Sequence, residues 1–233
     1  MTSLVAIHQP NLLPWLGFFD KMARADAFVL LDDAQFPKKG GTWTNRVRML
    51  VSREPAWVTV PVDRSYHGTR AINEMCIDES GPWRRKLVTT IEQSYRRAPR
   101  FDETMPLVAE LIELRTRCLA EFNEVGIRRV AGALGLDTGK LVPSSELGVE
   151  AEGTRRLVEL TRAVGGSGYL AGGGASGYQE DDLFAEAGLE LRYQSFEHPR
   201  YPQLAAEPVE GLSVVDALMS CGFEGTRALL GIT

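Results

Sequence analysis

Short apolar runs and helix-spaced apolar positions alternate along the first thirty residues. Residues 4–7 (LVAI) and 27–31 (AFVLL) are continuous apolar runs, which are typical of strands buried on both faces of a sheet. Between them, residues 15–25 place apolar side chains three and four positions apart, which predicts a helix. Strand, loop, helix and strand in this order predict a βαβ unit with parallel strands and a right-handed crossover.

The middle of the chain changes from strand-like to helical patterns. β-branched and alternating apolar residues predict strands, and apolar residues at helical spacing after Pro82 predict helices. The predicted strands are 46–51, 56–62 and 72–78, and the predicted helical regions are 82–98 and 105–134. Cys118 falls within the second helical region, which we expect to form one or two helices.

Strands and helices alternate again toward the C-terminus. The predicted strands are 140–145, 168–171 and 189–196, and the predicted helices are 153–164, 179–188 and a final one around 214–222. This order predicts an α/β fold with three layers and a mainly parallel sheet, of the Rossmann-like or nucleotidyltransferase-like kind. We expect one domain over residues 1–233, with a central helical insertion over 82–136.

Composition narrows the classes of protein. The 233 residues are 44% hydrophobic and 24% charged, which excludes wholesale disorder. The net charge is −5, so we expect neither a nucleic-acid-binding nor a membrane-binding surface. The three cysteines are far apart without a CxxC pair, and the N-terminal residues lack the pattern of a signal peptide. These features predict a cytoplasmic protein; they leave its oligomeric state open.

The first candidate site follows the first predicted strand, where residues 8–11 read HQPN. In an open α/β sheet, ligands bind at the carboxyl ends of the strands. His8 can act there as a general base or as a neutral hydrogen-bond donor. Gln9 and Asn11 can orient a substrate, or they can satisfy backbone groups of the loop. Trp15, where the predicted helix begins, is included among the substrate-binding residues.

Two carboxylates follow the second predicted strand. Asp32 and Asp33 can hold a divalent cation, set the tautomer of a histidine or accept a hydrogen bond from a substrate amine. Because parallel strands end at the same edge of a sheet, either aspartate could approach His8. We expect no metal site from the spacing of His and Cys residues.

A basic segment follows the two aspartates, although the protein as a whole has a net negative charge. Residues 38–48 (KKGGTWTNRVR) combine cations with glycines and a tryptophan, which indicates an anion-binding loop or a solvated surface loop. In the first interpretation, the loop holds a carboxylate, a phosphate or a phosphopantetheine arm. The residues assigned to this role are Lys39, Asn45, Arg46 and Arg48.

Two further features could take part in chemistry. The glycine-rich loop after residue 171 includes Gly173, Gly174 and Ser176, and its N–H groups could face a phosphate or carboxylate. It matches neither a Walker A loop nor GxGxxG, and Ser176 could instead cap the following helix. Cys221 could complete a thiol nucleophile set with His8 and an aspartate, or it could be a buried apolar residue.

Several stretches resemble the WbqC-like protein family. The opening IHQPNLLPWLGFFDKMARADAFVLLDDAQF is similar to the family pattern IHQPNYLPWLGYFDKI followed by D-x-F-V-x-LDD-x-Q. The resemblance continues through TWTNRVRM, WVTVPV, SGYLAGGGASGYQEDDLF and FEHPRYPQ to LSVVDALMSCG, so it covers essentially the whole chain. The usual KRSWQNRNRI-type loop reads KKGGTWTNRVRM here, with two glycines that look inserted.

The resemblance implies a biosynthetic role in polysaccharide (O-antigen) or natural-product pathways, with transfer of an acyl or aminoacyl group onto an amine. It carries over His8, Asp32, Asp33, Asn45 and Arg46. In this interpretation His8 deprotonates the amine, an aspartate orients the imidazole or holds the amine, and N–H groups of residues 172–177 stabilise an oxyanion. The implied partners are an amine or amino-acid substrate and an acyl-carrier-protein or CoA donor, without a cofactor.

Two alternatives stay open. The opening loosely resembles the nucleotide-binding domain of pantothenate synthetase-type enzymes, which implies an ATP- and Mg²⁺-dependent ligase or nucleotidyltransferase. The two-histidine HxGH signature of those enzymes is absent, because this chain reads HQPN. The other alternative is a non-catalytic protein that binds a sugar nucleotide or a carrier protein.

Overall fold

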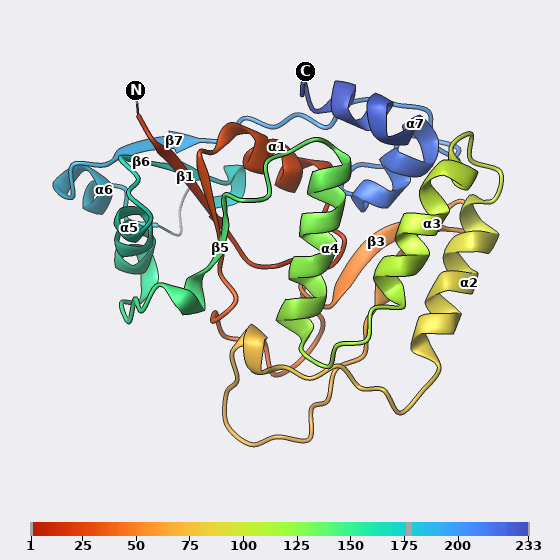
Figure 1. Cartoon of the computed structure of the whole chain (residues 1–233), viewed down its shortest axis with the longest axis horizontal. Coiled ribbons are helices and arrows are strands. Elements are labelled where there is room, and N and C mark those ends of the chain that lie inside the picture. The colour runs from red at the N-terminus through yellow and green to blue at the C-terminus, as the bar shows by residue number, and fades with distance from the viewer. Residues whose placement is uncertain (1, 176–178, 233) are drawn as a thin grey trace.

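A five-stranded parallel sheet forms one part of the fold, on the left in Figure 1. The computed structural model describes residues 2–175 and 179–232. The strands are β1 (Leu4–His8), β2 (Ala27–Leu30), β5 (Leu141–Pro143), β6 (Gly168–Ala171) and β7 (Glu190–Tyr193), in the order β5-β2-β1-β6-β7. All neighbouring strands in this sheet are parallel. β1 is therefore central, and the chain connects in opposite directions on its two sides.

Helices cover both faces of the sheet, because β1 is apolar on both faces. Val5 and Ile7 pack into a cluster with α5 (Gly153–Ala163) and α6 (Asp182–Glu186). Leu4 and Ala6 belong to the larger cluster on the other face, with α1 (Leu16–Arg24) and α4 (Leu119–Ala133). The alternation of side chains along a strand produces this division. The predicted three-layer α/β class with a mainly parallel sheet is confirmed.

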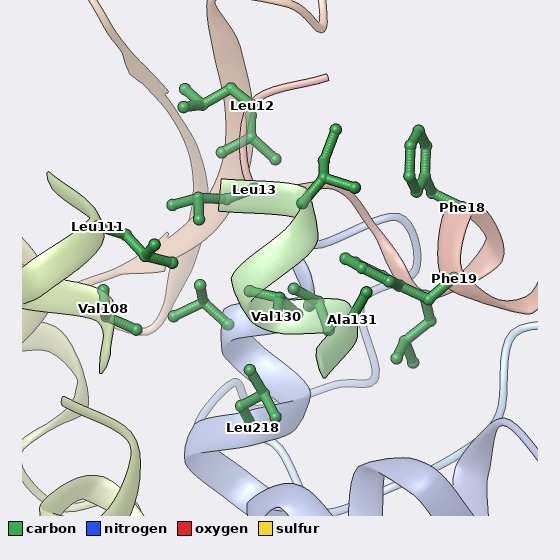
Figure 2. Packing of buried hydrophobic residues seen from close by; sticks show 14 of the residues in the cluster. Leu12, Leu13, Phe18, Phe19, Val108, Leu111, Val130, Ala131 and Leu218 are labelled. Atoms are coloured by element: carbon green, nitrogen blue, oxygen red, sulfur yellow. The ribbon is translucent and has the colours of Figure 1, made fainter. Parts of the chain in front are cut away.

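The larger cluster extends into a second group of elements beside the sheet. It consists of the antiparallel hairpin β3 (Arg46–Val51) and β4 (Glu54–Thr59) and the helices α2 (Trp83–Tyr95), α3 (Phe101–Ile112), α4 and α7 (Val214–Leu229). In Figure 2, Val130 and Ala131 of α4 lie between the loop residues Leu12 and Leu13 and Leu218 of α7. The loop after β1 is thus packed against this helical group.

Several local predictions need correction. Residues 72–78 do not form a strand, because residues 72–74 make a short 3₁₀ turn, held by the Glu74 carboxylate at the Ala71 N–H at 2.8 Å. The region 105–134 forms two helices, α3 and α4, which is one of the two expected arrangements, but Cys118 lies outside both and precedes α4 as its N-cap residue. The final helix extends to residue 229 through a kink at Gly222, whose φ of 72° suits a glycine. Among the described residues, no helix is long and apolar enough to cross a membrane.

Candidate active site

A pocket of about 420 Å³ lies at the carboxyl ends of β1, β6 and β7. The strand order reverses at β1, whose neighbours are β2 on one side and β6 on the other. Such a reversal is the usual position of a ligand site in an open parallel sheet. The side chains and backbone used below come from His8, Trp15, Lys21, Tyr169, Gly172, Gly173, Gly174, Gln194 and Phe196.

His8, the last residue of β1, brings an imidazole to the pocket. Its ring packs edge-on against Phe18 of α1, with 4.9 Å between the ring centres. Nδ1 lies 3.0 Å from the carbonyl oxygen of Gln9. A carbonyl can only accept, so Nδ1 carries the proton and Nε2 keeps its lone pair. The neutral ring can therefore accept a hydrogen bond at Nε2.

The surroundings keep His8 neutral. Burial, together with the positive charge of Lys21, lowers the pKa of His8 from 6.5 to about 4, although the bond to Gln9 acts in the opposite direction. At neutral pH the imidazole is uncharged and available as an acceptor. A negative charge bound nearby would raise the pKa of His8 toward the working pH, where a general base is most effective.

Lys21 lines the same pocket and supplies a positive charge there. It lies on α1, its side chain is only 3% exposed, and Nζ donates to the carbonyl oxygen of Ile7 at 2.9 Å. The Nζ atom is 5.9 Å from the centre of the Tyr169 ring. Burial lowers the pKa of Lys21 from 10.5 to about 8.

Gln194 fixes the relative position of β7 and α1. It follows β7 and is buried, and its Nε2 donates to the Gly17 carbonyl at 2.8 Å and to Asp20 Oδ2 at 2.6 Å. The bond to the Gly17 carbonyl joins positions 177 residues apart in sequence. This amide therefore holds the first turn of α1 against the end of the sheet, beside His8 and Lys21.

An aromatic wall closes one side of the pocket. The Trp15 ring packs against Phe196, with 5.4 Å between centres, and against His198 at 5.2 Å. The ring also lies directly over Gly17, where a Cβ atom would be 2.1 Å from it. Glycine at this position therefore allows Trp15 to fold back over the start of α1.

The HQPN loop is held from several directions. Asn123 of α4 donates from Nδ2 to the carbonyls of Pro10 and Thr44, at 2.8 and 2.6 Å. The Ser213 hydroxyl donates to the Leu13 carbonyl at 2.7 Å. Asn11 is buried within this loop, and Gln9 contributes its carbonyl to His8. These bonds fix the direction in which the chain leaves β1.

The two aspartates do not meet His8. Asp32 accepts from the Ser145 backbone N–H at 3.0 Å and from the Ser145 hydroxyl at 2.7 Å. Asp33 accepts from the Ser144 hydroxyl and from Arg156 of α5. Both carboxylates thus join the end of β2 to the residues after β5, on the side away from β6. The imidazole is oriented by the Gln9 carbonyl in place of an aspartate.

The basic loop is organised by its own contacts. Asn45 is buried, accepts from the Thr42 N–H at 3.0 Å and donates to the Val60 carbonyl at 3.2 Å. The Arg46 guanidinium lies over the Trp57 ring, 4.4 Å from its centre. Lys39 is exposed and Arg48 is partly buried on β3. Within the described residues, the pocket lining includes none of these four residues. A cation that sequence reasoning missed, Arg64, donates to the carbonyls of Lys38 and Gly40, each at 2.6 Å.

Of the three loop residues after β6 that the sequence predicts in the site, two line the pocket. The predicted nucleophile Cys221 does not line it. Gly173 and Gly174 line the pocket beside His8, as the strand-end argument predicts. Ser176 lies outside the described residues. Cys221 is on α7, where burial and the nearby Asp216 raise the pKa of its thiol. The described residues contain no group of three or more His, Cys, Asp or Glu side chains that could hold a metal ion.

Sequence reasoning missed Lys21, Gln194, Tyr169 and Phe196. One signal was available for Lys21, which is three residues after Phe18 and directly before Met22, on the apolar stripe of the predicted helix. A lysine inside such a stripe either extends its ammonium group past the apolar surface to solvent or is buried, and a buried lysine indicates a functional site. Gln194 and Phe196 enter the pocket through tertiary packing, for which the local pattern gives no sign.

The fold and the position of the pocket define a parallel α/β protein with a pocket, a candidate ligand site, where the strand order reverses. A family model described as the WbqC-like protein family matches residues 9–228, and the chain belongs to this family. It is 29% identical over 222 residues to the uncharacterized protein Rv1507c of Mycobacterium tuberculosis (strain ATCC 25618 / H37Rv), covering 94% of each chain. No solved structure matches it.

Proposed function

We propose that this protein is a group-transfer enzyme that moves an acyl or aminoacyl group onto the amine of a small substrate. The observation that carries the proposal is the His8 imidazole at the switch-point pocket, with Nδ1 occupied by the Gln9 carbonyl and Nε2 left as an acceptor. A neutral imidazole beside backbone N–H donors is the combination that acyl transfer needs. Membership in the WbqC-like family is compatible with this role.

The proposed reaction begins with the amine nitrogen attacking the carbonyl carbon of the acyl donor. A C–N bond forms, and His8 Nε2 takes the proton that the amine loses. Negative charge develops on the carbonyl oxygen, and N–H groups at Gly172, Gly173 and Gly174 would stabilise it. The bond to the leaving group then breaks, and His8 returns the proton to it. A thioester of CoA or of a carrier protein is the proposed class of donor.

A second candidate function is nucleotide-dependent ligation or nucleotidyl transfer. The strand order β5-β2-β1-β6-β7 favours it, because mononucleotides bind at this reversal point in doubly wound sheets. The first turn of α1 has no side-chain cap and follows the β1 loop, as the phosphate-binding helices of such folds do. The HQPN sequence supplies one histidine where the HxGH signature of pantothenate synthetase-type enzymes has two, which counts against this function.

A ligand-induced thermal shift on wild type and His8→Asn separates these functions. The panel holds ATP with Mg²⁺, acyl-CoA, sugar nucleotides and free amino acids, because a selective ligand stabilises the folded state. We expect shifts with an amino acid or acyl-CoA, and acylated product by mass spectrometry when both are supplied. His8→Asn should lose the product but remain folded. His67→Asn, in an exposed loop, is the matched control.

Each other outcome has a defined meaning. A shift only with ATP and Mg²⁺ would replace acyl transfer by the nucleotide-dependent function. Binding of any of these ligands without turnover would indicate a non-catalytic binding protein. Full activity of His8→Asn would refute the assigned role of His8.

A further inference from the structure

The pocket contains a buried cation that has no carboxylate partner among the described residues. Lys21 is 3% exposed, and its one hydrogen bond within the described residues goes to a neutral backbone carbonyl. No described carboxylate lies within 4.0 Å of its Nζ. The remaining residues, Met1, 176–178 and Thr233, include no Asp or Glu. An ammonium group has three N–H donors, so Lys21 has donors to spare.

The nearest carboxylate in sequence is used elsewhere. Asp20 precedes Lys21 and is also buried, but its Oδ1 accepts from Arg24 Nε at 2.9 Å and its Oδ2 accepts from Gln194 Nε2 at 2.6 Å. The fold therefore places a carboxylate next to Lys21 along the chain and gives it other partners. Burying an unpaired ammonium is expensive, so its retention calls for a compensating role.

The charges of the described lining point to one class of ligand. Lys21 is the lining residue with a full positive charge, and the described lining includes no Asp or Glu. The backbone of Gly172, Gly173 and Gly174 also lines the pocket, where its N–H groups are available as further donors to an anion. The pocket is therefore cationic and rich in donors in a protein with a net charge of −5.

We infer that Lys21 is the specificity-determining receptor for an anionic oxygen group of the substrate, a carboxylate or a phosphate, which binds between Nζ and the backbone of residues 172–174. The inference rests on the proposed function for the identity of the pocket and adds the charge of its substrate. The anion would neutralise the buried ammonium and lie close to His8. It would raise the affinity of His8 for a proton, so that binding prepares the base.

A matched pair of probes tests this inference. N-acetylglycine carries a carboxylate, and N-acetylglycinamide has nearly the same shape without the charge; inorganic phosphate is the third probe. Thermal shifts and Kd by calorimetry are measured at constant ionic strength on wild type, Lys21→Met, Lys21→Gln and Lys140→Met. Lys140 is the control because it also donates to a backbone carbonyl, that of Ala25 at 2.8 Å, outside the pocket.

We expect at least one anion to stabilise wild type and Lys140→Met, and the neutral amide to stabilise neither. Loss of a charge-assisted hydrogen bond should weaken that anion about 10- to 100-fold in Lys21→Met and Lys21→Gln. A preference for N-acetylglycine or for phosphate identifies the group as carboxylate or phosphate. Three results would overturn the inference: anion affinity in the Lys21 variants equal to that of wild type, shifts with the neutral amide equal to those with the anion, or no shift by either anion in wild type.

The outcomes for Lys21 and for group transfer are distinct. If His8→Asn retains the anion-induced shift and also retains full transfer activity, the catalytic proposal fails while the anion site stands. If transfer depends on His8 but the Lys21 variants bind the anion normally, the anion site is wrong and the catalytic proposal stands.

Discussion

Replacing Lys21 by methionine should stabilise the protein in the absence of ligand. The folded state holds this ammonium in a buried position, where its pKa falls from 10.5 to about 8. A depression of this size corresponds to roughly 3 kcal/mol of unfavourable free energy at neutral pH. Methionine has a similar length, carries no charge and suits an apolar helix face. It removes the bond from Nζ to the Ile7 carbonyl, which costs about 1 kcal/mol.

The net gain is therefore about 2 kcal/mol, or about 4–8 °C in Tm for a chain of this size. The gain should depend on pH. Between about pH 8 and 10.5 the unfolded chain holds more protons at this lysine than the folded chain does. The stability of wild type consequently rises by about 3 kcal/mol across this window. The advantage of Lys21→Met should therefore disappear at its upper end, where only the loss of the bond to the Ile7 carbonyl remains.

Urea unfolding of wild type and Lys21→Met at pH 7 and pH 10.5 measures both quantities. Lys140→Met is again the control, because Lys140 is partly exposed and has Asp137 and Asp26 nearby, so its change should be much smaller. A Lys21→Met protein that is less stable than wild type at pH 7 would refute the reasoning. An equal gain at both pH values would show that packing, rather than a buried charge, is responsible.

Three further predictions concern His8, Asn123 and Tyr95. The folded-state pKa of His8 is about 4 against 6.5 when unfolded, so the free energy of unfolding of wild type should fall by up to roughly 3 kcal/mol as the pH falls from 6.5 to 4. Urea unfolding of His8→Asn over this pH range should show a fall that is smaller by this amount. An equal dependence of stability on pH in the two proteins would contradict the lowered pKa of His8. Asn123→Leu removes the amide that donates to two loop carbonyls and should cost about 2–4 kcal/mol by urea unfolding; unchanged stability would show that other contacts hold the loop. Tyr95→Phe removes a donor to the buried Asp216 and the acceptor of a β3 backbone N–H, which should cost about 2–3 kcal/mol; Tyr193→Phe, whose hydroxyl bonds to an exposed carboxylate, should change stability far less in the same assay.

The sheet could be predicted from the sequence because its information is local. Residues 4–7 and 27–31 are apolar on both faces, and the helix between them has the spacing of a helix packed on a sheet. The prediction of a strand at residues 72–78 was wrong because the apolar residues of this segment are buried by a turn and isolated β-bridges rather than by a continuous strand pairing. A pattern of burial alone cannot distinguish these two environments.

The candidate site could be predicted in part, for a related reason. Strand ends indicate where a pocket lies, and His8, Gly173 and Gly174 do meet there. The direction of a side chain after a strand depends on partners elsewhere, as Asp32 shows by turning toward Ser145. Gln194 reaches the pocket through bonds to α1, a contact between segments far apart in the chain.

The bond from the Ser213 hydroxyl to the Leu13 carbonyl spans 200 positions of the sequence, and it has a consequence for synthesis. β1 emerges from the ribosome early, but its neighbour β6 begins at Gly168, and the bond from Ser213 to the loop after β1 forms only when the start of α7 arrives. A nascent chain that ends before Gly168 presents an unpaired edge of β1, and one that ends before Ser213 lacks the bond to the Leu13 carbonyl that helps hold the loop after His8. Chaperones that recognise nascent apolar strands therefore have their longest opportunity at the very segment that carries His8.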